Sequence, residues 1–309
     1  MAVSFSQLVS RISQQLQGYT KDQASISYLV AAMNATDVTF SVDPETVTNL
    51  SRGLIQIDDE LLLVKKYDRA SGVVTLFGGS STNGRGVEGT TAASHALEAL
   101  ITDDPVFPRQ RIKEAINDTI RGVYPDLWVF ANTEFNYVAA RYEYVLPSAA
   151  EDVYKVVVNT IGPSRVWFPA QKWRFNSQSS LGTSQSPSGA TGKSLQLYDF
   201  IVPGRAVRVT YTKAPAVLVN NSDDFESVSG LPERVIDLIT YGACWRLLPA
   251  YEAARLQQQN IEATERAPLV PPGSAMKASE LFLSLYQKRL AEERDRLFRL
   301  FENYQSYSS

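Results

Sequence analysis

Residues 54–101 read LIQIDDELLLVKKYDRASGVVTLFGGSSTNGRGVEGTTAASHALEALI, and their pattern predicts a small β-rich unit. Three segments of strand length, LIQID, ELLLV and VVTLF, either alternate apolar with polar residues or are apolar almost throughout. Short stretches that contain Asp or Gly separate them, which is typical of turns. Because the alternating segment DVTFSV at 37–42 precedes them, we expect the β-rich unit to span residues 35–92.

Helical periodicity lies on both sides of this unit. Residues 3–17 carry one apolar face, and a second helix is predicted at 108–122, with a Pro in its first turn and a Gly at its end. The face expected to be buried in that second helix consists of Ile112, Ala115, Ile116, Thr119, Ile120 and Val123. Further helices are predicted at 231–248 and 276–304, and Pro249 is expected to stop or bend the first of them.

Residues 135–212 return to the period of β-strands. Five candidate strands there are rich in Tyr, Val, Phe and Trp, and a Ser-, Gly- and Gln-rich segment at 176–194 is expected to form a long exposed loop. Because strands and helices do not alternate one for one, the fold class is predicted to be α+β. We expect a helical bundle with an inserted antiparallel β domain and a second, small N-terminal β-rich domain. The domain boundaries are predicted at 1–103 and 104–309.

The composition restricts the classes of function. The 309 residues carry 30 Lys and Arg against 33 Asp and Glu, a formal net charge of −3, whereas proteins that neutralise DNA phosphates usually carry a basic excess. A single Cys and a single His exclude an internal disulfide and the usual Cys/His structural zinc site. We find no catalytic constellation, so the sequence predicts no enzyme activity, no cofactor and no metal.

The sequence also predicts a soluble protein that is made in a cytoplasm. The first residues, MAVSFSQLVSRISQQLQGY, lack the basic start and apolar core of a signal peptide. No stretch of about 18 apolar residues is present, so no membrane-spanning helix is expected.

Two glycine-containing segments match parts of nucleotide-binding motifs. GRGVEG at 84–89 has the spacing G-x-G-x-x-G, but no βαβ pattern surrounds it, and we favour a surface turn that closes the β-rich unit. GATGKS at 189–194 is similar to the end of a P-loop, but Pro187 stands where the first Gly belongs. The next segment has the pattern of a strand where a P-loop requires a helix, so we favour a plain loop.

Three further features have simple structural interpretations. His95 is more plausible as a hydrogen-bonded structural or surface residue than as a general base, because no nucleophile motif lies near it. The run Asp58, Asp59 and Glu60 between apolar segments indicates a turn, since its spacing differs from that of a calcium loop. Cys244 lies beside Trp245 in an apolar helix and is predicted to be a small buried apolar residue.

Aromatic and arginine side chains gather in the second β-unit. Trp128, Trp167 and Trp173 lie in or next to it, with Arg165 and Arg174 among them. Such residues stack on single-stranded bases in some proteins, but they are also enriched at contacts between proteins. We favour the protein-contact interpretation.

The segment 54–101 resembles a pattern found in neck and tail proteins of tailed bacteriophages. That pattern has an Ile-x-Ile-Asp-x-Glu strand followed by an Arg-Gly-x-x-Gly-Thr-x-Ala-x-x-His turn. The matching residues are Ile55, Ile57, Asp58, Glu60, Arg85, Gly86, Gly89, Thr90, Ala92 and His95. The rest of the chain is similar in element order to head-to-tail adaptor proteins, as is the segment FPRQRIKEAINDTIRGVYPDLW.

The resemblance implies a structural, non-enzymatic virion protein that forms a ring, often of twelve copies, between portal and tail. The ring leaves a channel through which DNA passes without sequence-specific binding, and the partners are other copies, the portal protein and neck or tail proteins. Two alternatives stay open: another tail or baseplate protein, or a carbohydrate- or cell-surface-binding module. The candidate contact residues are Arg85, Gly86, Trp167, Trp173, Phe282, Tyr286, Leu297, Phe301 and Tyr304.

Overall fold

A computed structural model of the chain describes residues 2–17, 26–43, 50–78, 84–160, 166–179, 192–262 and 274–300. They combine α-helices with β-sheets in which every strand pair that is described is antiparallel. The chain divides into two compact units, each built from segments distant in sequence. The barrel unit comprises Ser4–Thr119 and Asp237–Tyr286, and the sandwich unit comprises Met1–Val3, Ile120–Ile236 and Gln287–Ser309. The division of the chain at residue 103 stays a prediction.

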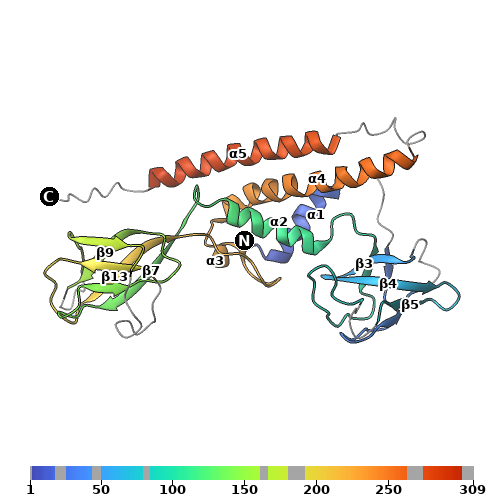
Figure 1. The fold of residues 1–309 in the computed structure, drawn as a ribbon, viewed down its shortest axis with the longest axis horizontal. Helices are drawn as coiled ribbons and strands as arrows, with labels where there is room; N and C mark the ends of the chain where they lie inside the picture. The colour runs from blue at the N-terminus through green and yellow to red at the C-terminus, as the bar shows by residue number, and fades with distance from the viewer. Residues whose placement is uncertain are drawn as a thin grey trace. The chain divides into compact units, whose positions relative to one another are not determined.

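A six-stranded sheet forms the β part of the barrel unit, in the order β1-β6-β3-β4-β5-β2. Figure 1 labels β3, β4 and β5 of this sheet. Its strands are β1 (Ile26–Tyr28), β2 (Thr39–Ser41), β3 (Gly53–Ile57), β4 (Glu60–Asp68), β5 (Val73–Leu76) and β6 (Leu100–Asp103). Beyond β1 and β2, the chain pairs Leu29 with Val42, and the N–H of Val30 donates to the carbonyl of Ser41 at 3.1 Å. This pairing joins the two outer strands, so the sheet closes into a barrel and no long open edge is left.

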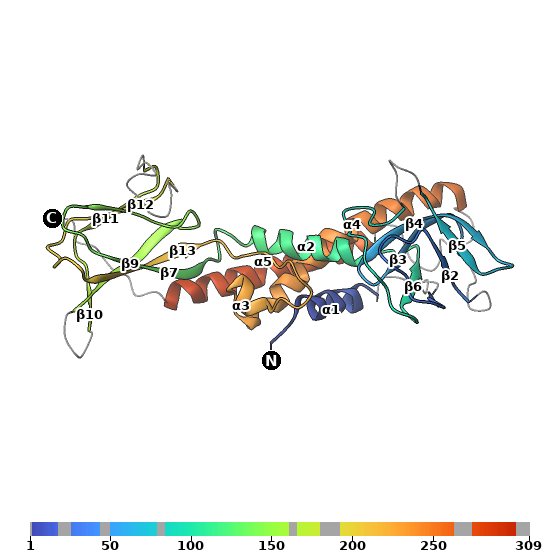
Figure 2. The ribbon, with the colours of Figure 1, turned by 90° about the horizontal axis from the view of Figure 1, so that it is seen from below.

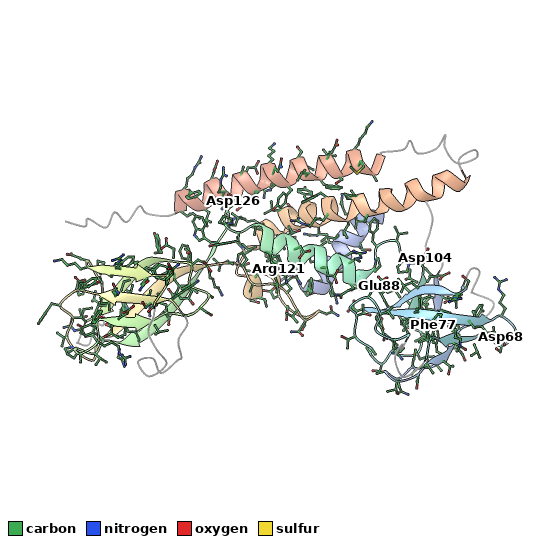
Figure 3. All side chains as sticks on the ribbon, viewed as in Figure 1. Asp68, Phe77, Glu88, Asp104, Arg121 and Asp126 are labelled. Carbon is green, nitrogen blue, oxygen red and sulfur yellow. The ribbon has the colours of Figure 1, made fainter. Side chains whose placement is uncertain are left out.

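The interior of the barrel is apolar. Its buried residues are Leu29, Met33, Phe40, Val42, Leu50, Ile55, Ile57, Leu62, Val64, Val74, Leu76 and Ile101. Tight turns connect its strands. Asp68, labelled in Figure 3, ends β4, and its carboxylate accepts hydrogen bonds from the N–H of Ala70 at 3.2 Å and the hydroxyl of Ser71 at 2.9 Å. The strand signals at 37–42, 54–58, 60–64 and 73–77 and the turn signal between the last two therefore predicted the local structure correctly.

Four helices contribute to the barrel unit: α1 (Phe5–Gln17), α2 (Arg109–Gly122), α4 (Ile236–Glu262) and α5 (Ser274–Leu300), of which α2, α4 and α5 also supply residues to the sandwich unit. All six residues of the face predicted to be buried in α2 are buried. The barrel unit holds α2 and α4 close together at Gly242, where a Cβ would lie 2.2 Å from the Cγ2 of Thr119.

Among the described residues, two sheets form the β part of the sandwich unit, and several of their strands are labelled in Figure 2. One sheet has the order β10-β9-β13-β7 and the other β11-β12-β8. The strands are β7 (Val129–Asn136), β8 (Glu143–Val145), β9 (Asp152–Asn159), β10 (Trp167–Pro169), β11 (Trp173–Asn176), β12 (Ser194–Leu197) and β13 (Ala206–Lys213). Side chains from both sheets share one core, which includes Val156, Leu195, Val209 and Tyr211.

The structure differs from the prediction in several places. One of the five predicted strands is two strands, β10 and β11, which belong to different sheets. The β-unit begins at Val129, because β7, which the sequence analysis missed, pairs with β13 over eight residue pairs. A five-residue helix, α3 (Phe225–Ser229), and a short 3-10 turn (Glu233–Val235) precede α4. Pro249 does not end α4, which continues to Glu262. An internal proline costs a helix roughly 3 kcal/mol. Packing offsets this cost here, since Leu248 beside the proline is fully buried. Within the predicted loop 176–194, residues 180–191 lie outside the described residues.

Candidate functional site

Three residues of the phage-like pattern, Arg85, Gly86 and His95, meet at the buried carboxylate of a fourth, Glu60. Glu60, the first residue of β4, accepts hydrogen bonds from Arg85 through Nε (2.7 Å) and Nη2 (2.9 Å). The N–H groups of Gly86 and Ala93 donate to the same carboxylate, each at 2.9 Å. The Nε2 of His95 lies 2.9 Å from it. Glu60 therefore helps to fasten residues 84–95 to the barrel.

Arg85 extends this network to a third segment. Its guanidinium also donates to the carbonyls of Asn34 (2.7 Å), Asp37 (2.9 Å) and Ala93 (2.6 Å). The side chain is fully buried, so its positive charge is neutralised and hydrogen-bonded inside the unit. The predicted surface turn at 84–89 is confirmed only at its end, where Glu88 and Gly89 form an exposed turn, whereas Gly84 and Arg85 are buried. A Cβ at Gly84 would lie 2.7 Å from the carbonyl oxygen of Leu63, so the glycine permits a close approach of two backbone segments.

His95 bridges two carboxylates and is 4% exposed. Its Nδ1 lies 2.8 Å from Asp58 and its Nε2 2.9 Å from Glu60. An ionised carboxylate only accepts hydrogen bonds, so the two contacts together favour the protonated imidazole, in which both ring nitrogens donate. The hydrogen bond to Glu60 is the main cause that raises the pKa of His95, and it outweighs burial. This confirms the interpretation of His95 as a hydrogen-bonded structural residue.

Burial by itself would raise the pKa of Glu60. The hydrogen bonds from Arg85, His95 and Ala93 outweigh burial and lower this pKa to about 2. The β3–β4 turn predicted at Asp58 and Asp59 is confirmed, whereas Glu60 belongs to the strand.

Asp59 connects the barrel to α2 inside the barrel unit. Its carboxylate pairs with Arg109 at 2.8 Å and with Lys113 at 3.1 Å. The side chain of Gln56 adds a hydrogen bond from the N–H of Arg109 at 3.1 Å. All of these contacts fix structure. Among the described residues, no group of three or more His, Cys, Asp or Glu is arranged to hold a metal ion.

Four of the candidate contact residues have side chains that are buried or partly buried within their own unit. Arg85 is buried in the network, and Phe282 (3% exposed) and Tyr286 (7% exposed) are buried in the barrel unit. Trp173 packs against the sandwich core. Gly86 and Leu297 are half-buried, and Phe301 and Tyr304 lie outside the described residues. The structure therefore does not gather the candidates into one site, and their role in contacts stays a prediction.

Trp167 lies on the outer face of the four-stranded sheet. The guanidinium of Arg208 stands over its ring, 4.2 Å from the ring centre, and also pairs with Glu134 at 2.5 Å. A cavity of about 400 Å³ adjoins these side chains and is lined by Lys155, Val157, Trp167, Pro169, Arg208 and Thr210. The sequence analysis identified Trp167 but missed Arg208, which reaches the tryptophan only through the pairing of β9 with both β10 and β13.

Cys244 is fully buried, as predicted, and burial raises the pKa of its thiol to about 12. A thiol with this pKa is not a nucleophile at neutral pH. In the part of the chain that the structure describes, no helix is both long and apolar enough to cross a membrane.

Comparison with known proteins agrees with the resemblance of the sequence. A search of curated proteins gave no match. The family model for SU10 adaptor protein matches residues 90–297, which is more than half of the chain and includes His95, α2, the sandwich strands and most of α5. The chain therefore belongs to the SU10 adaptor protein family, whose members are structural adaptors of bacteriophages.

Proposed function

We propose that this protein is a head-to-tail adaptor whose copies form a ring between the portal and the tail of a virion. The family match over residues 90–297 is the observation that carries the proposal. Twelve copies are expected from the resemblance to neck adaptors. The ring acts by fitting its surfaces to its neighbours, and no bond is made or cleaved by it.

The architecture that we propose for this role is a helical bundle of α1, α2, α4 and α5. The barrel and the sandwich are the β-domains inserted into its connections, and the element order supports this proposal, because β1–β6 lie between α1 and α2 and β7–β13 between α2 and α4. The two β-domains then provide different surfaces of the chain. A ring requires two different contact surfaces on each copy, because its interfaces are heterologous.

The charge of the chain supports passage of DNA through the ring. A channel that passes DNA works best when it does not bind the phosphates strongly, and a formal net charge of −3 fits this requirement. The channel is thus proposed to guide DNA without reading its sequence.

The test is reconstitution with purified portal rings of the same phage. We expect a stable complex on a sucrose gradient and, in negative-stain images, a ring of adaptor copies on one end of the portal. A chain that stays monomeric in the presence of portal and tail proteins would contradict the proposal. Binding to tail or baseplate proteins alone would favour the alternative of another tail component.

The cavity beside Trp167 is the feature that supports the carbohydrate-binding alternative, because sugars stack on aromatic rings. Arg208 already covers one face of that ring, however. Binding of the intact protein to glycans, without binding to portal rings, would favour this alternative.

A further inference from the structure

Strand β7 forms one edge of the four-stranded sheet, and among the described residues only β13 pairs with it. The two strands align over eight residue pairs without a register shift. The other edge strands of the sandwich unit, β8, β10 and β11, are only three or four residues long, and β10 ends in Pro169. β7 is therefore the long edge of this unit.

The alternation of hydrogen bonds between β7 and β13 shows which backbone groups of β7 face the open edge. The N–H of Tyr137, directly after β7, donates to the carbonyl of Arg205 at 2.8 Å. In an antiparallel pair, residues that bond to the partner strand alternate with residues whose backbone groups point away from it. The N–H and C=O groups of Asn132, Glu134 and Asn136, which we call the edge residues, therefore face away from β13.

This edge lacks the features that usually protect an edge strand. Proteins protect long edges with Pro, Lys, a bulge or a covering segment, because unpaired backbone groups accept strands of other chains. β7 reads VFANTEFN, contains no Pro, Lys or Arg, and has no bulge relative to β13. The charge of Glu134 is compensated by Arg208, at 2.5 Å. A covering segment is the remaining form of protection.

The end of α5 lies beside the start of β7 within the sandwich unit. The ring of Phe298 meets that of Trp128 edge-on, with the ring centres 5.2 Å apart. Arg294 lies 3.7 Å from Asp126, which Figure 3 labels. Trp128 immediately precedes β7, and Phe298 comes two residues before the end of α5. The residues that follow Leu300 therefore start next to the first residue of β7.

The segment 301–309 has the composition and the length to cover this edge. It reads FENYQSYSS, with three aromatic residues that favour strands and with no Pro or Gly. At about 3.3 Å per residue, nine extended residues reach roughly 30 Å, and the eight residues of β7 span roughly 25 Å. The segment is thus long enough to follow the whole strand.

We propose that residues 301–309 pair as an added strand with the open edge of β7 in the same chain. Both segments run away from the contact between Trp128 and Phe298, so the pairing is parallel. The added strand occupies the backbone groups of the edge residues and keeps other chains from pairing with them. This inference does not depend on the proposed ring.

The first experiment measures hydrogen exchange of single amides by NMR, on the monomeric fraction of the full chain and of a chain that lacks residues 301–309. We expect the amides of the edge residues to exchange about tenfold or more faster in the shortened chain, because their hydrogen bonds are lost. The amides of Thr133 and Phe135 face β13 and are the control within the same strand. Their exchange should not change.

Proline substitutions test the same pairing without shortening the chain. Proline donates no hydrogen bond to a neighbouring strand. Since neighbouring residues of a strand direct their N–H groups to opposite sides, either Tyr304→Pro or Gln305→Pro removes an N–H that donates to β7. We expect one of the two variants to lose the protection of the edge residues. Ser309→Pro is the matched control at the end of the segment and should keep most of this protection.

Analytical ultracentrifugation tests the protective role. We expect the shortened chain to self-associate at about tenfold lower concentration than the full chain, because its edge is open to other chains. Loss of amide protection without any gain in self-association would contradict this role.

Two results would overturn the pairing itself. The first is equal exchange of the edge residues in the full and the shortened chain. The second is protection that is present only in assembled fractions, because a neighbouring copy would then supply the strand. Both results leave the proposed ring to its own test with portal rings.

Discussion

The carboxylate of Glu60 accepts hydrogen bonds from four different residues in a buried site, so its replacement should be costly. Glu60→Gln keeps the size of the side chain but removes the negative charge that pairs with Arg85 and His95. The new amide N–H₂ group would also face N–H donors and could not accept their hydrogen bonds. We expect the free energy of unfolding of the barrel unit to fall by about 3–5 kcal/mol. Urea denaturation, followed by intrinsic fluorescence, measures the change.

The matched control is Glu280→Gln on an exposed position of α5. Surface substitutions of this kind usually change stability by less than about 0.5 kcal/mol. Equal, small effects of the two substitutions would show that the Glu60 network does not stabilise the barrel unit.

His95 predicts a dependence of stability on pH. Glu60 and Asp58 raise the pKa of His95 in the folded chain. The contribution of His95 to the free energy of unfolding is therefore fully present below the pKa of the unfolded chain, near 6.5. This contribution is lost as the pH rises through the folded pKa. Glu60 acts in the opposite direction, because its pKa is lowered from 4.5 to about 2 in the folded chain. Its contribution to the free energy of unfolding is fully present above pH 4.5 and is lost as the pH falls toward 2.

We therefore expect the free energy of unfolding to decrease on the alkaline side of pH 6.5, and this decrease to flatten in His95→Gln. Denaturation curves at a series of pH values measure both chains. An unchanged alkaline slope in the variant would argue that another group titrates there.

At the scale of elements, Gly242 sets how closely α4 approaches α2. Alanine normally stabilises a helix by up to about 1 kcal/mol relative to glycine. Here its Cβ would lie 2.2 Å from Thr119 Cγ2 and 3.1 Å from Tyr286 Cδ2, so Gly242→Ala should destabilise the protein by about 1–3 kcal/mol. Chemical denaturation measures this effect.

Thr119→Ser provides the rescue for this substitution. It removes the clashing methyl but keeps the hydroxyl that accepts from Arg246 (3.0 Å) and donates to the carbonyl of Ala115 (2.7 Å). The double variant should recover part of the stability that Gly242→Ala loses. Strictly additive effects would mean that the contact between these two residues is not the cause.

At the scale of the whole molecule, the small negative charge predicts weak binding to DNA. At about 0.15 M salt, we expect fluorescence anisotropy of a labelled duplex to show no saturable binding by the chain or by its assembled rings. Tight binding that weakens steeply with salt would reveal a basic surface and contradict a channel that passes DNA freely.

The sequence by itself determined the local structure. The apolar face of α2, the turn at Asp58–Asp59 and the mixed α and β content all follow from the spacing of apolar and turn residues over a few positions. The resemblance of the rest of the chain to head-to-tail adaptors is confirmed by the family match over residues 90–297. The sequence did not show β7, whose residues are only partly buried, nor the continuation of α4 through Pro249, where packing outweighs a local penalty.

Only the tertiary structure decided what the pattern residues do. Arg85 and His95 are 25 and 35 positions from Glu60, and no periodicity or spacing rule relates charges at such separations. Closure of the barrel brings them to one buried carboxylate, where low polarity makes each missing partner costly. The tertiary structure also decides the exposure of Phe200. The next residue, Ile201, is buried in the sandwich core, whereas the side chain of Phe200 is exposed to solvent. Burial depends on the whole fold, whereas periodicity depends on neighbours in the chain.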